Sequence, residues 1–594
     1  MGEKKTYLIN IDGMRADYFG TVGHQGCLTP TLVSLAEQGI RFSNCKTIMP
    51  ANTGTNHTAI MTSAHAGSHG ILGVGGCYKG LNKEYFRFSK KYGTILTGMY
   101  EHKHLQIPTF FNIIKTNNPN LITAFIPGKT WLGNIIADED CDVTIFTGNT
   151  KDNCGKHKAN PEYVTDSEGY VLGGLAHPED NEILPRFYFP KKGEIEMEPP
   201  GTLNAALVKI DADSLPSDKW IIDQAINCVD NDDPDFMYMI LMNLDMAGHA
   251  YGAFLSDKNP DEVDVKNLCT LRNPNAARDQ LYLTDLEVKR FIDHLRKKEL
   301  YHDARIIIIS DHGMNTTKSM FSGISRKRRL YWLLEKLHIV KWSEIYKSFL
   351  FAELKEELDI DIRRIFAEHE IHMRASQGRW FHRYNKQGDY DWCYSDGGIV
   401  GCIYNVDLST QRKIKTILRD YTIKENGKTM HPIWNVLTEE DMNDAENEYT
   451  HRPFRLGRGD FNNEYDAMWP SVIVFPRPHY MIPMYNDQLY AGLMPLMVHV
   501  NLPGFIDFRT APGLHGTYLE QDVPLIFVSP NEPEVPSGVV YNEQVSVLDI
   551  IPTINFLNGW PDQSSFEGRP IIPISKKREK KGRVKPEISV STSK

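Results

Sequence analysis

The sequence has no apolar run long enough to cross a membrane and no surplus of basic residues. A membrane-spanning helix needs about 20 consecutive apolar residues, whereas the longest apolar stretches here, such as Phe236–Leu244, have the length of a strand. The 594 residues include 66 Lys and Arg against 76 Asp and Glu, which gives a net charge of −10. Because contacts with nucleic-acid phosphates require a surplus of positive charge, we expect no nucleic-acid binding by the body of the protein.

The sequence also lacks paired cysteines, and we expect no secretory leader. The nine cysteines are scattered without a Cys-x-x-Cys pair, and no apolar leader segment precedes the first strand-like run. An odd number of cysteines in a large chain of this kind predicts reduced thiols and a cytoplasmic protein. Apolar residues make up 41% of the chain and charged residues 24%. These are ordinary proportions for a folded protein, so a wholly disordered chain is excluded.

Short apolar runs alternate with helical stretches along most of the chain. The runs are nearly continuous rather than alternating, which is typical of strands covered on both faces. With helices such as 276–298 between them, they predict an α/β fold whose doubly wound, mostly parallel sheet carries helices on both faces. The predicted strands are 6–11, 40–47, 121–126, 236–244, 305–310, 472–475 and 523–529.

Composition divides the chain into a discontinuous core and three further segments. The core is predicted to comprise residues 1–315 and 391–575. Residues 145–215 are polar and rich in Gly, Pro and Asn, which predicts an insertion near the site. Residues 316–390 predict amphipathic helices, either as a cap over a site or as a structural insertion. Residues 576–594 predict a disordered basic tail, either a solvated end or a segment that binds anionic lipid or nucleic acid.

Aspartates and histidines follow three of the predicted strands, and one more histidine lies in a late loop. In open α/β sheets, ligands bind beyond the carboxyl ends of the strands, so we expect these side chains to converge. Carboxylate and imidazole groups suit zinc, manganese and related cations, and this set suffices for two metal ions. The residues are Asp12, Asp245, His249, Asp311, His312 and His515.

A segment rich in hydroxyl groups, residues 50–70, leads into a predicted helix. A Thr hydroxyl at a helix N-terminus is well placed for phosphoryl chemistry, because the helix dipole and the backbone N–H groups favour an anion. A metal bound to that hydroxyl makes it a nucleophile. The alternative is that these threonines only cap the helix.

The order of these motifs resembles the alkaline phosphatase superfamily, and within it the branch of nucleotide pyrophosphatases/phosphodiesterases and phosphonoacetate hydrolases. The motifs are Asp12, Thr-x-x-Asn-His, Asp-x-x-Gly-His, Asp-His-Gly-Met and Gly-x-His-Gly. The resemblance extends from residue 6 to about residue 570 and includes the segments Val547–Thr553 and Phe566–Arg569. It implies an alkaline phosphatase-like fold with two divalent metal ions. Zinc is expected because it is the usual metal of the family, and manganese is the alternative.

The resemblance also implies roles for individual residues. Thr53 is the expected nucleophile, because it precedes Asn56-His57 as the threonine of the family does, and Thr55 is its nearest rival. A covalent phospho-threonine would form and then be hydrolysed. The first metal would be held by Asp12, Thr53, Asp311 and His312, and the second by Asp245, His249 and His515.

The substrate pocket departs from the family pattern at one position. Members of this branch carry an Asn after the Ser-His-Gly-Ile segment, and Val74 stands there instead. Backbone N–H groups near Gly73 and Gly75 are candidates to replace it. Asn56 and Lys129 are further candidates for substrate contact. Three histidines are interpreted as structural or as supports of the ligands, namely His57, His65 and His69.

The resemblance implies a hydrolase that cleaves phosphodiester, phosphoanhydride or phosphonate bonds in a small substrate. A phosphomonoesterase and a phosphomutase of the same superfamily are the alternatives. A sulfatase is disfavoured, because the segment around Thr53 lacks a Cys/Ser-x-Pro-x-Arg sequence. A binding protein with an inactive site belongs to a different class, and the complete set of expected ligands argues against it. The natural substrate and the oligomeric state stay open.

Overall fold

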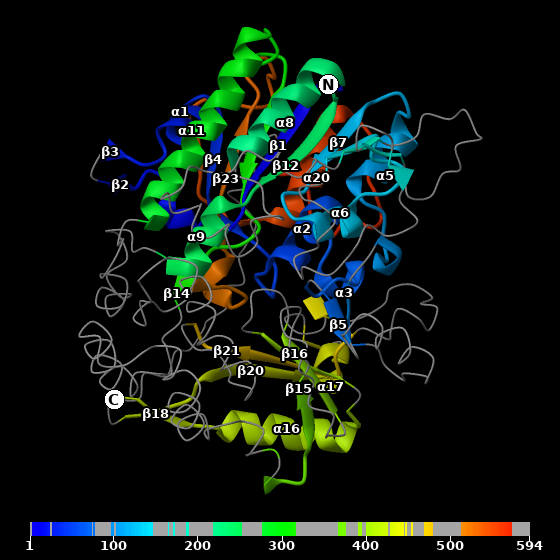
Figure 1. The fold of residues 1–594 in the computed structure, drawn as a ribbon, viewed down its shortest axis with the longest axis vertical. Coiled ribbons are helices and arrows are strands. Elements are labelled where there is room, and N and C mark those ends of the chain that lie inside the picture. Colours follow the sequence, from blue (N-terminus) through cyan, green and yellow to red (C-terminus); the bar gives the residue numbers. More distant parts are fainter. Residues whose placement is uncertain are drawn as a thin grey trace.

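The structure is a computed structural model with a large twelve-stranded sheet and a smaller five-stranded sheet (Figure 1). It describes residues 3–23, 26–73, 75–77, 97–99, 102–145, 164–165, 170–172, 186–188, 218–251, 253, 276–316, 366, 368–375, 390–394, 400–404, 406–425, 428–444, 446–447, 453–454, 469–478 and 513–572.

The large sheet is mostly parallel in its centre. Its strands are β1 (Thr6–Ile11), β4 (Ile40–Lys46), β7 (Thr123–Ile126), β8 (Val143–Ile145), β9 (Val164–Thr165), β10 (Tyr170–Leu172), β11 (Arg186–Tyr188), β12 (Phe236–Leu241), β13 (Arg305–Ile309), β23 (Asp522–Val528), β24 (Val539–Tyr541) and β25 (Val545–Ser546). Their order is β24-β4-β23-β13-β1-β12-β7-β8-β11-β10-β9, and β25 pairs with β4. The strands β13, β1, β12, β7 and β8 are parallel, whereas β23 runs antiparallel to both neighbours.

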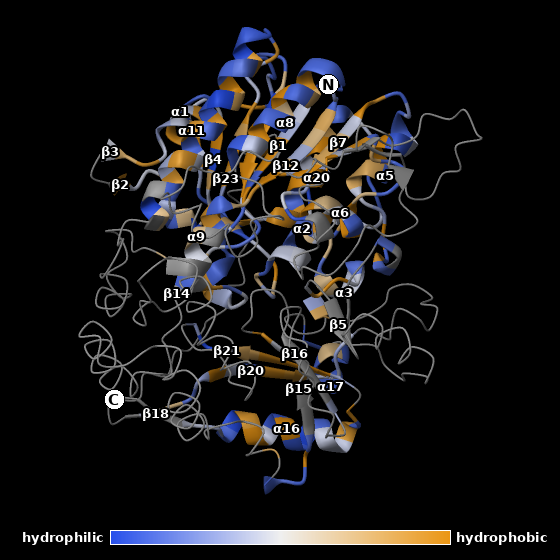
Figure 2. Cartoon of the chain, in the orientation of Figure 1, coloured by the Kyte–Doolittle hydropathy of each residue, from blue (hydrophilic) through white to orange (hydrophobic). Residues whose placement is uncertain are grey.

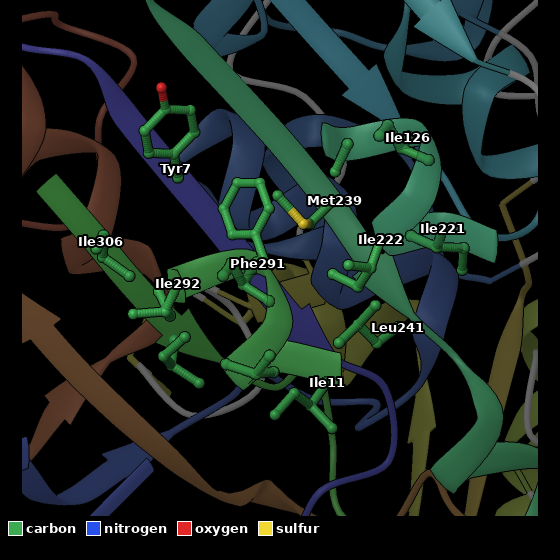
Figure 3. Close-up of a cluster of buried hydrophobic side chains, with 14 of the residues drawn as sticks. Tyr7, Ile11, Ile126, Ile221, Ile222, Met239, Leu241, Phe291, Ile292 and Ile306 are labelled. Carbon is green, nitrogen blue, oxygen red and sulfur yellow. The ribbon is translucent and has the colours of Figure 1, made fainter. Parts of the chain in front are cut away.

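Helices cover both faces of this sheet, which is why its central strands are continuous apolar runs. The side chains of Tyr7, Ile9 and Ile11 join one core cluster, and that of Leu8 joins the other. Figure 3 shows the first cluster, where Phe291 meets Tyr7 edge-to-face with ring centroids 5.6 Å apart. The first face carries α1 (Pro30–Glu37), α8 (Asp218–Asn231) and α11 (Ala276–Lys297), and the second carries α2 (Thr53–Thr62), α5 (Phe110–Asn117), α6 (Thr130–Ile136) and α20 (Ile550–Asn558). The predicted doubly wound α/β fold is confirmed.

The hydropathy of the elements agrees with this layering. Figure 2 shows apolar residues along the central strands and polar residues along the outward sides of α8 and α11. A fully buried Leu, Ile or Phe side chain contributes about 1.5–3 kcal/mol. Burial on both faces of the sheet is therefore the main force that holds the carboxyl ends of the strands in place.

The smaller sheet lies beyond the carboxyl edge of the large one (Figure 1). Its order is β15 (Met373–Ala375), β16 (Tyr390–Tyr394), β17 (Gly401–Tyr404), β21 (Val472–Pro476) and β20 (Ile433–Thr438). The helix α16 (Leu408–Asp420) covers one face, and the other face packs against α2 and α3 (Ala66–His69). The prediction that residues 472–475 belong to the central sheet was therefore wrong. The apolar pattern indicated burial on both faces, and it does not specify the sheet.

The remaining elements are short connections around these two sheets. They are η1 (Ala16–Tyr18), β2 (Val22–Gly23), β3 (Gly26–Cys27), β5 (Gly75–Cys77), β6 (Thr97–Met99), η2 (His102–His104), α9 (Asn243–Tyr251), β14 (Asn315–Thr316), β18 (Ile423–Glu425), β19 (Lys428–Met430), α17 (Glu439–Asn443), β22 (Gly513–Leu514), η5 (Tyr518–Gln521) and η6 (Val547–Asp549).

Several sequence predictions concern residues that the structure does not describe. The helices expected within 316–390 lie outside the described residues, and β15 is the main described piece of that segment. Most of 145–215 is likewise outside, although β9, β10 and β11 of that segment extend the large sheet. The tail 576–594 is outside as well. Among the described residues, no helix combines the length and the apolar character needed to span a membrane.

Candidate active site

Three aspartates meet at the carboxyl edge of the large sheet. Asp12 directly follows β1, Asp311 follows β13 after one residue, and Asp245 lies in the first turn of α9, which follows β12. All three carboxylates are buried. The predicted strand 236–244 ends earlier, at Leu241, so Asp245 enters the site from a helix rather than from a strand end.

Close backbone contacts bring these segments together. Gly13 has a φ of +77°, and a Cβ atom there would lie 2.9 Å from the Cα atom of Asp245. A Cβ on Gly54 would lie 2.3 Å from the carbonyl oxygen of Gly73. Only glycine permits both approaches. Gly73 is thus placed beside the start of α2, while Gly75 lies in β5 and Val74 is outside the described residues.

Two groups of ligand atoms share this edge. Asp12, Asp311 and His312 form one group and Asp245, His312 and His515 the other, with atoms in each group within 4.8 Å of one another. Nε2 of His312 lies 3.3 Å from Asp12 Oδ1 and 3.2 Å from Asp311 Oδ2. Nε2 of His515 lies 3.7 Å from Asp245 Oδ1, and the two imidazole rings stack with centroids 3.5 Å apart.

The backbone contacts of the two histidines fix the tautomer of each ring, and with it the nitrogen whose lone pair faces the carboxylates. Nδ1 of His312 is 2.8 Å from the carbonyl oxygen of Gly313, and Nδ1 of His515 is 3.1 Å from that of Ala51. A carbonyl oxygen only accepts, so Nδ1 carries the proton in both rings and Nε2 carries the lone pair.

Lone pairs and carboxylates directed at one small volume repel each other, and a divalent cation removes that repulsion. This repulsion affects Asp12. Burial first, and then the carboxylates of Asp245 and Asp311, raise the pKa of the Asp12 carboxyl well above its usual value. The donors are carboxylate oxygens and imidazole nitrogens, the set that zinc and manganese accept. The residues present therefore fit a divalent metal centre.

Lys129 enters the same cluster from the turn after β7. Gly128, with a φ of +64°, precedes it. The ammonium nitrogen lies 2.6 Å from Asp12 Oδ2 and 3.0 Å from Asp245 Oδ2, and it donates a hydrogen bond of 3.3 Å to Thr53 Oγ1. The sequence indicated Lys129 as a substrate contact. The structure places its charge between the ligand carboxylates themselves, which the sequence did not predict.

Thr53 is the first residue of α2, and its hydroxyl faces the cluster. The N-cap of the helix is Asn52, whose side chain accepts from the backbone N–H of Thr55 at 3.0 Å. The alternative that Thr53 serves as the cap is therefore excluded. Its Oγ1 lies 3.1 Å from His312 Nε2, and the hydroxyl donates to that lone pair. The hydroxyl of Thr55 is buried and has no hydrogen-bond partner among the described residues.

One other predicted site residue, Asn56, stands apart from this cluster. Asn56 uses its side-chain amide to hold the loop before α2: it accepts from the N–H of Ile48 and donates to the carbonyl oxygens of Ile48, Pro50 and Asn52. These contacts give Asn56 a structural role, and its contact with substrate stays a prediction. His249 lies in α9 one turn after Asp245, and its side chain is outside the described residues.

Sequence reasoning missed two buried groups that support the site. Tyr238 of β12 hydrogen-bonds to Nδ1 of His57, whose Nε2 lies 3.3 Å from Asp311 Oδ2. Burial, and secondarily the charge of Lys129, lowers the pKa of His57 well below its usual value. His57 lies one helical turn after Thr53, and this spacing was the sequence signal that placed its side chain on the same face of the helix, near the site.

Asp218 is the second missed group, at the start of α8. It accepts from the N–H groups of Met242 and Asn243 at 2.9 and 3.1 Å and from the hydroxyl of Thr284 at 2.6 Å. Burial raises the pKa of this carboxyl to about 6. The contacts satisfy the first N–H groups of α9 and so fix the turn that carries Asp245. Nothing in the local sequence of residue 218 marks this role.

The turn Phe566–Arg569, noted for its family resemblance, anchors the other end of α2. Glu567 pairs with His65 and accepts from the hydroxyl of Ser68, and its N–H donates to the carbonyl oxygen of Ser63. The histidine contact lowers the pKa of Glu567 to about 2 against the opposing effect of burial. His69 nearby accepts from the N–H of Ile71, and burial lowers its pKa to about 3. Both histidines are therefore structural.

The low pKa of Glu567 predicts a pH-dependent contribution to stability. The carboxylate stabilises the fold above pH 4.5 and loses this effect as the pH falls from 4.5 toward 2, because the folded-state pKa is the lower one. Glu567→Gln should lower the free energy of unfolding at pH 7 by about 3 kcal/mol, and the deficit should shrink below pH 4.5. Urea denaturation at several pH values measures it, and a deficit that is constant with pH would contradict the assignment.

The residues of this site lie in a part of the chain that is similar to known proteins. A family model described as type I phosphodiesterase / nucleotide pyrophosphatase matches residues 6–398, a range that contains every ligand candidate except His515. An uncharacterized pyrophosphatase/phosphodiesterase of Schizosaccharomyces pombe is 22% identical over 326 residues, which are 55% of this chain and 46% of that protein. This chain thus spans less than half the length of that curated relative.

Two solved structures are also similar over most of the chain. Murine ectonucleotide pyrophosphatase / phosphodiesterase 5 has a TM-score of 0.48 at 13% identity, with 94% of this chain and 96% of that chain covered. Phosphonoacetate hydrolase from Sinorhizobium meliloti 1021 has a TM-score of 0.47 at 14% identity, with 93% and 94% covered.

Proposed function

The chain belongs to the family of type I phosphodiesterases and nucleotide pyrophosphatases, and from this premise we propose that it hydrolyses phosphodiester, phosphoanhydride or phosphonate bonds in a small substrate. Thr53 is the nucleophile, and two divalent metal ions, zinc in the first place, occupy the ligand groups at the sheet edge. The observation that carries the proposal is the hydroxyl of Thr53, which is not used as a helix cap and lies 3.1 Å from His312 Nε2 within the ligand cluster.

The proposed metal residues are assigned to two positions. Asp12, Asp311 and His312, with the hydroxyl of Thr53, would hold the first ion. Asp245, His249 and His515 would hold the second. When bound, such ions supply positive charge on both sides of a phosphorus atom and lower the pKa of a coordinated hydroxyl.

The chain's own residues then account for the covalent steps. Thr53 Oγ1 gives up its proton and attacks phosphorus, the bond from phosphorus to the leaving oxygen or carbon breaks, the leaving group takes up a proton, and a phospho-threonine results. Water next attacks this phosphorus, the bond to Thr53 Oγ1 breaks, and a proton from the water returns to Oγ1 and restores the hydroxyl. The α2 N-terminus places its backbone N–H groups and helix dipole toward the anion. Lys129 adds a positive charge beside the attacking oxygen, which stabilises the charge that develops in in-line transfer.

A substrate panel tests this proposal. The metal-loaded protein is assayed with a bis-aryl phosphate, an aryl phosphate monoester and an aryl phosphonate monoester. We expect the diester or the phosphonate monoester to be preferred. Thr53→Ala should lower kcat by about 10³-fold or more, since without this hydroxyl the phospho-threonine can neither form nor be hydrolysed.

Thr55→Ala is the matched control, because it removes a hydroxyl of the same kind two residues further along the same buried helix. It should retain most of the activity. A variant pattern in which Thr55→Ala is inactive and Thr53→Ala is active would overturn the nucleophile assignment. Preference for the monoester would instead indicate a phosphomonoesterase.

A further inference from the structure

We propose that His57 and Tyr238 form a buried support that fixes the carboxylate of Asp311 in the orientation required for metal binding. The inference rests on the metal centre of the proposed function and adds to it two positioning residues from different elements. His57 lies in α2, in the same helix as Thr53, and Tyr238 lies in β12.

The contacts define a directional chain of groups. Nδ1 of His57 hydrogen-bonds to the hydroxyl of Tyr238, and Nε2 lies 3.3 Å from Asp311 Oδ2. A neutral imidazole has one N–H and one lone pair, and an ionised carboxylate can only accept. With the tyrosine hydroxyl donating to Nδ1, the imidazole N–H is on Nε2, whose contact with Asp311 Oδ2 at 3.3 Å is electrostatic rather than a hydrogen bond. Tyr238 thus selects the tautomer that can support the carboxylate.

The support acts on an oxygen that also belongs to the ligand cluster. Asp311 Oδ2 lies between Nε2 of His57 at 3.3 Å and Nε2 of His312 at 3.2 Å. The terminal torsion of an aspartate is broad, so a carboxylate with contacts on one side only can rotate. The partial positive charge of the Nε2–H group, 3.3 Å from Oδ2, attracts that oxygen, narrows the rotation and keeps the ligand atoms of Asp311 directed at the first metal position.

The support itself is held rigidly. The side chains of His57, Tyr238 and Asp311 are all fully buried. The Tyr238 ring stacks on Phe125 of β7, with centroids 5.3 Å apart and planes 10° apart, and its backbone pairs with Leu8 of β1. Because His57 stands one turn after Thr53, the same helix presents the nucleophile and orients a ligand of the first metal.

Removal of such supports typically lowers metal affinity 10–100-fold. Tyr238→Phe deletes only the hydroxyl and keeps the ring stack on Phe125. His57→Phe deletes both nitrogen contacts, whereas His57→Gln keeps an N–H donor near the position of Nε2. We expect dissociation constants for Zn²⁺ and Mn²⁺ to rise about 10-fold in Tyr238→Phe and up to about 100-fold in His57→Phe, with partial rescue in His57→Gln.

The constants are measured on the full chain by competition with a chromophoric chelator, and thermal unfolding of the metal-free variants monitors the fold. Tyr7→Phe is the matched control, since Tyr7 is also fully buried in the large sheet but lies in the opposite core cluster. Its metal affinity should equal that of the wild type. Tyr238→Phe and His57→Phe proteins that bind metal like the wild type would overturn the inference, and so would an equal loss in Tyr7→Phe.

This result is separate from the outcome of the substrate panel, because binding is measured without turnover. If the wild-type chain bound no divalent metal, the metal centre of the proposed function would fail, and this inference would fail with it. If the wild type bound metal and the variants did not differ from it, only the inference would fail.

Discussion

Removal of divalent metal with a chelator should abolish hydrolysis and lower the free energy of unfolding, and added zinc or manganese should restore both. The reason is electrostatic: Asp12, Asp245 and Asp311 are buried together, and the lone pairs of two histidines face them. One ion at 100 times its dissociation constant stabilises the folded state by about 2.7 kcal/mol. Two sites would therefore contribute about 5 kcal/mol, a large part of the stability of an ordinary domain.

Thermal unfolding with and without the chelator measures the second effect, and elemental analysis confirms that the metal has been removed. In Asp12→Asn, the stabilisation by metal should be largely lost together with activity. Asp285→Asn is the control, because Asp285 is another buried aspartate but accepts from the N–H groups of Thr31 and Leu32 at the start of α1. It should lower stability by about 0.5–2 kcal/mol and leave the response to metal unchanged. Full activity in verified metal-free protein would contradict the prediction.

Much of the fold could be predicted from the sequence because buried strands appear in it as continuous apolar runs. The strands β1, β7, β12 and β13 are continuous apolar runs, and helices lie between most of them. The resemblance to the phosphodiesterase branch is confirmed by the family model. The assignment of residues 472–475 failed for the same physical reason: an apolar strand covered on both faces has the same pattern in either sheet.

The candidate site was predictable where chemistry coincides with a strand end. Asp12 and Asp311 are polar residues directly after apolar runs, so their convergence follows from parallel topology. The supports were not predictable in this way. Tyr238 reads as one more apolar position of β12, and Asp218 is distant in sequence from the turn that it holds. Their roles depend on contacts between elements, which a periodic pattern does not contain.

Replacement of Lys129 by methionine should destabilise the metal-free protein by about 3–5 kcal/mol. The substitution keeps the aliphatic length and removes the ammonium group, which lies between Asp12 and Asp245 at 2.6 and 3.0 Å. The two carboxylates would then remain buried beside each other without that charge. In the metal-bound protein the ions supply the missing positive charge, so the deficit should become smaller.

The diagnostic quantity is therefore the increase in unfolding temperature on addition of saturating zinc, which should be larger in Lys129→Met than in the wild type. Lys46→Met is the control, since Lys46 pairs with Asp522 at a partly exposed position. Surface pairs contribute about 0–1 kcal/mol, and this variant should show the wild-type response to zinc. An equal response in Lys129→Met would mean that the ammonium group does not stabilise the ligand carboxylates in the absence of metal. The KM of Lys129→Met then separates the two roles of the side chain, because a raised KM with an unchanged response to zinc would assign Lys129 to substrate binding alone.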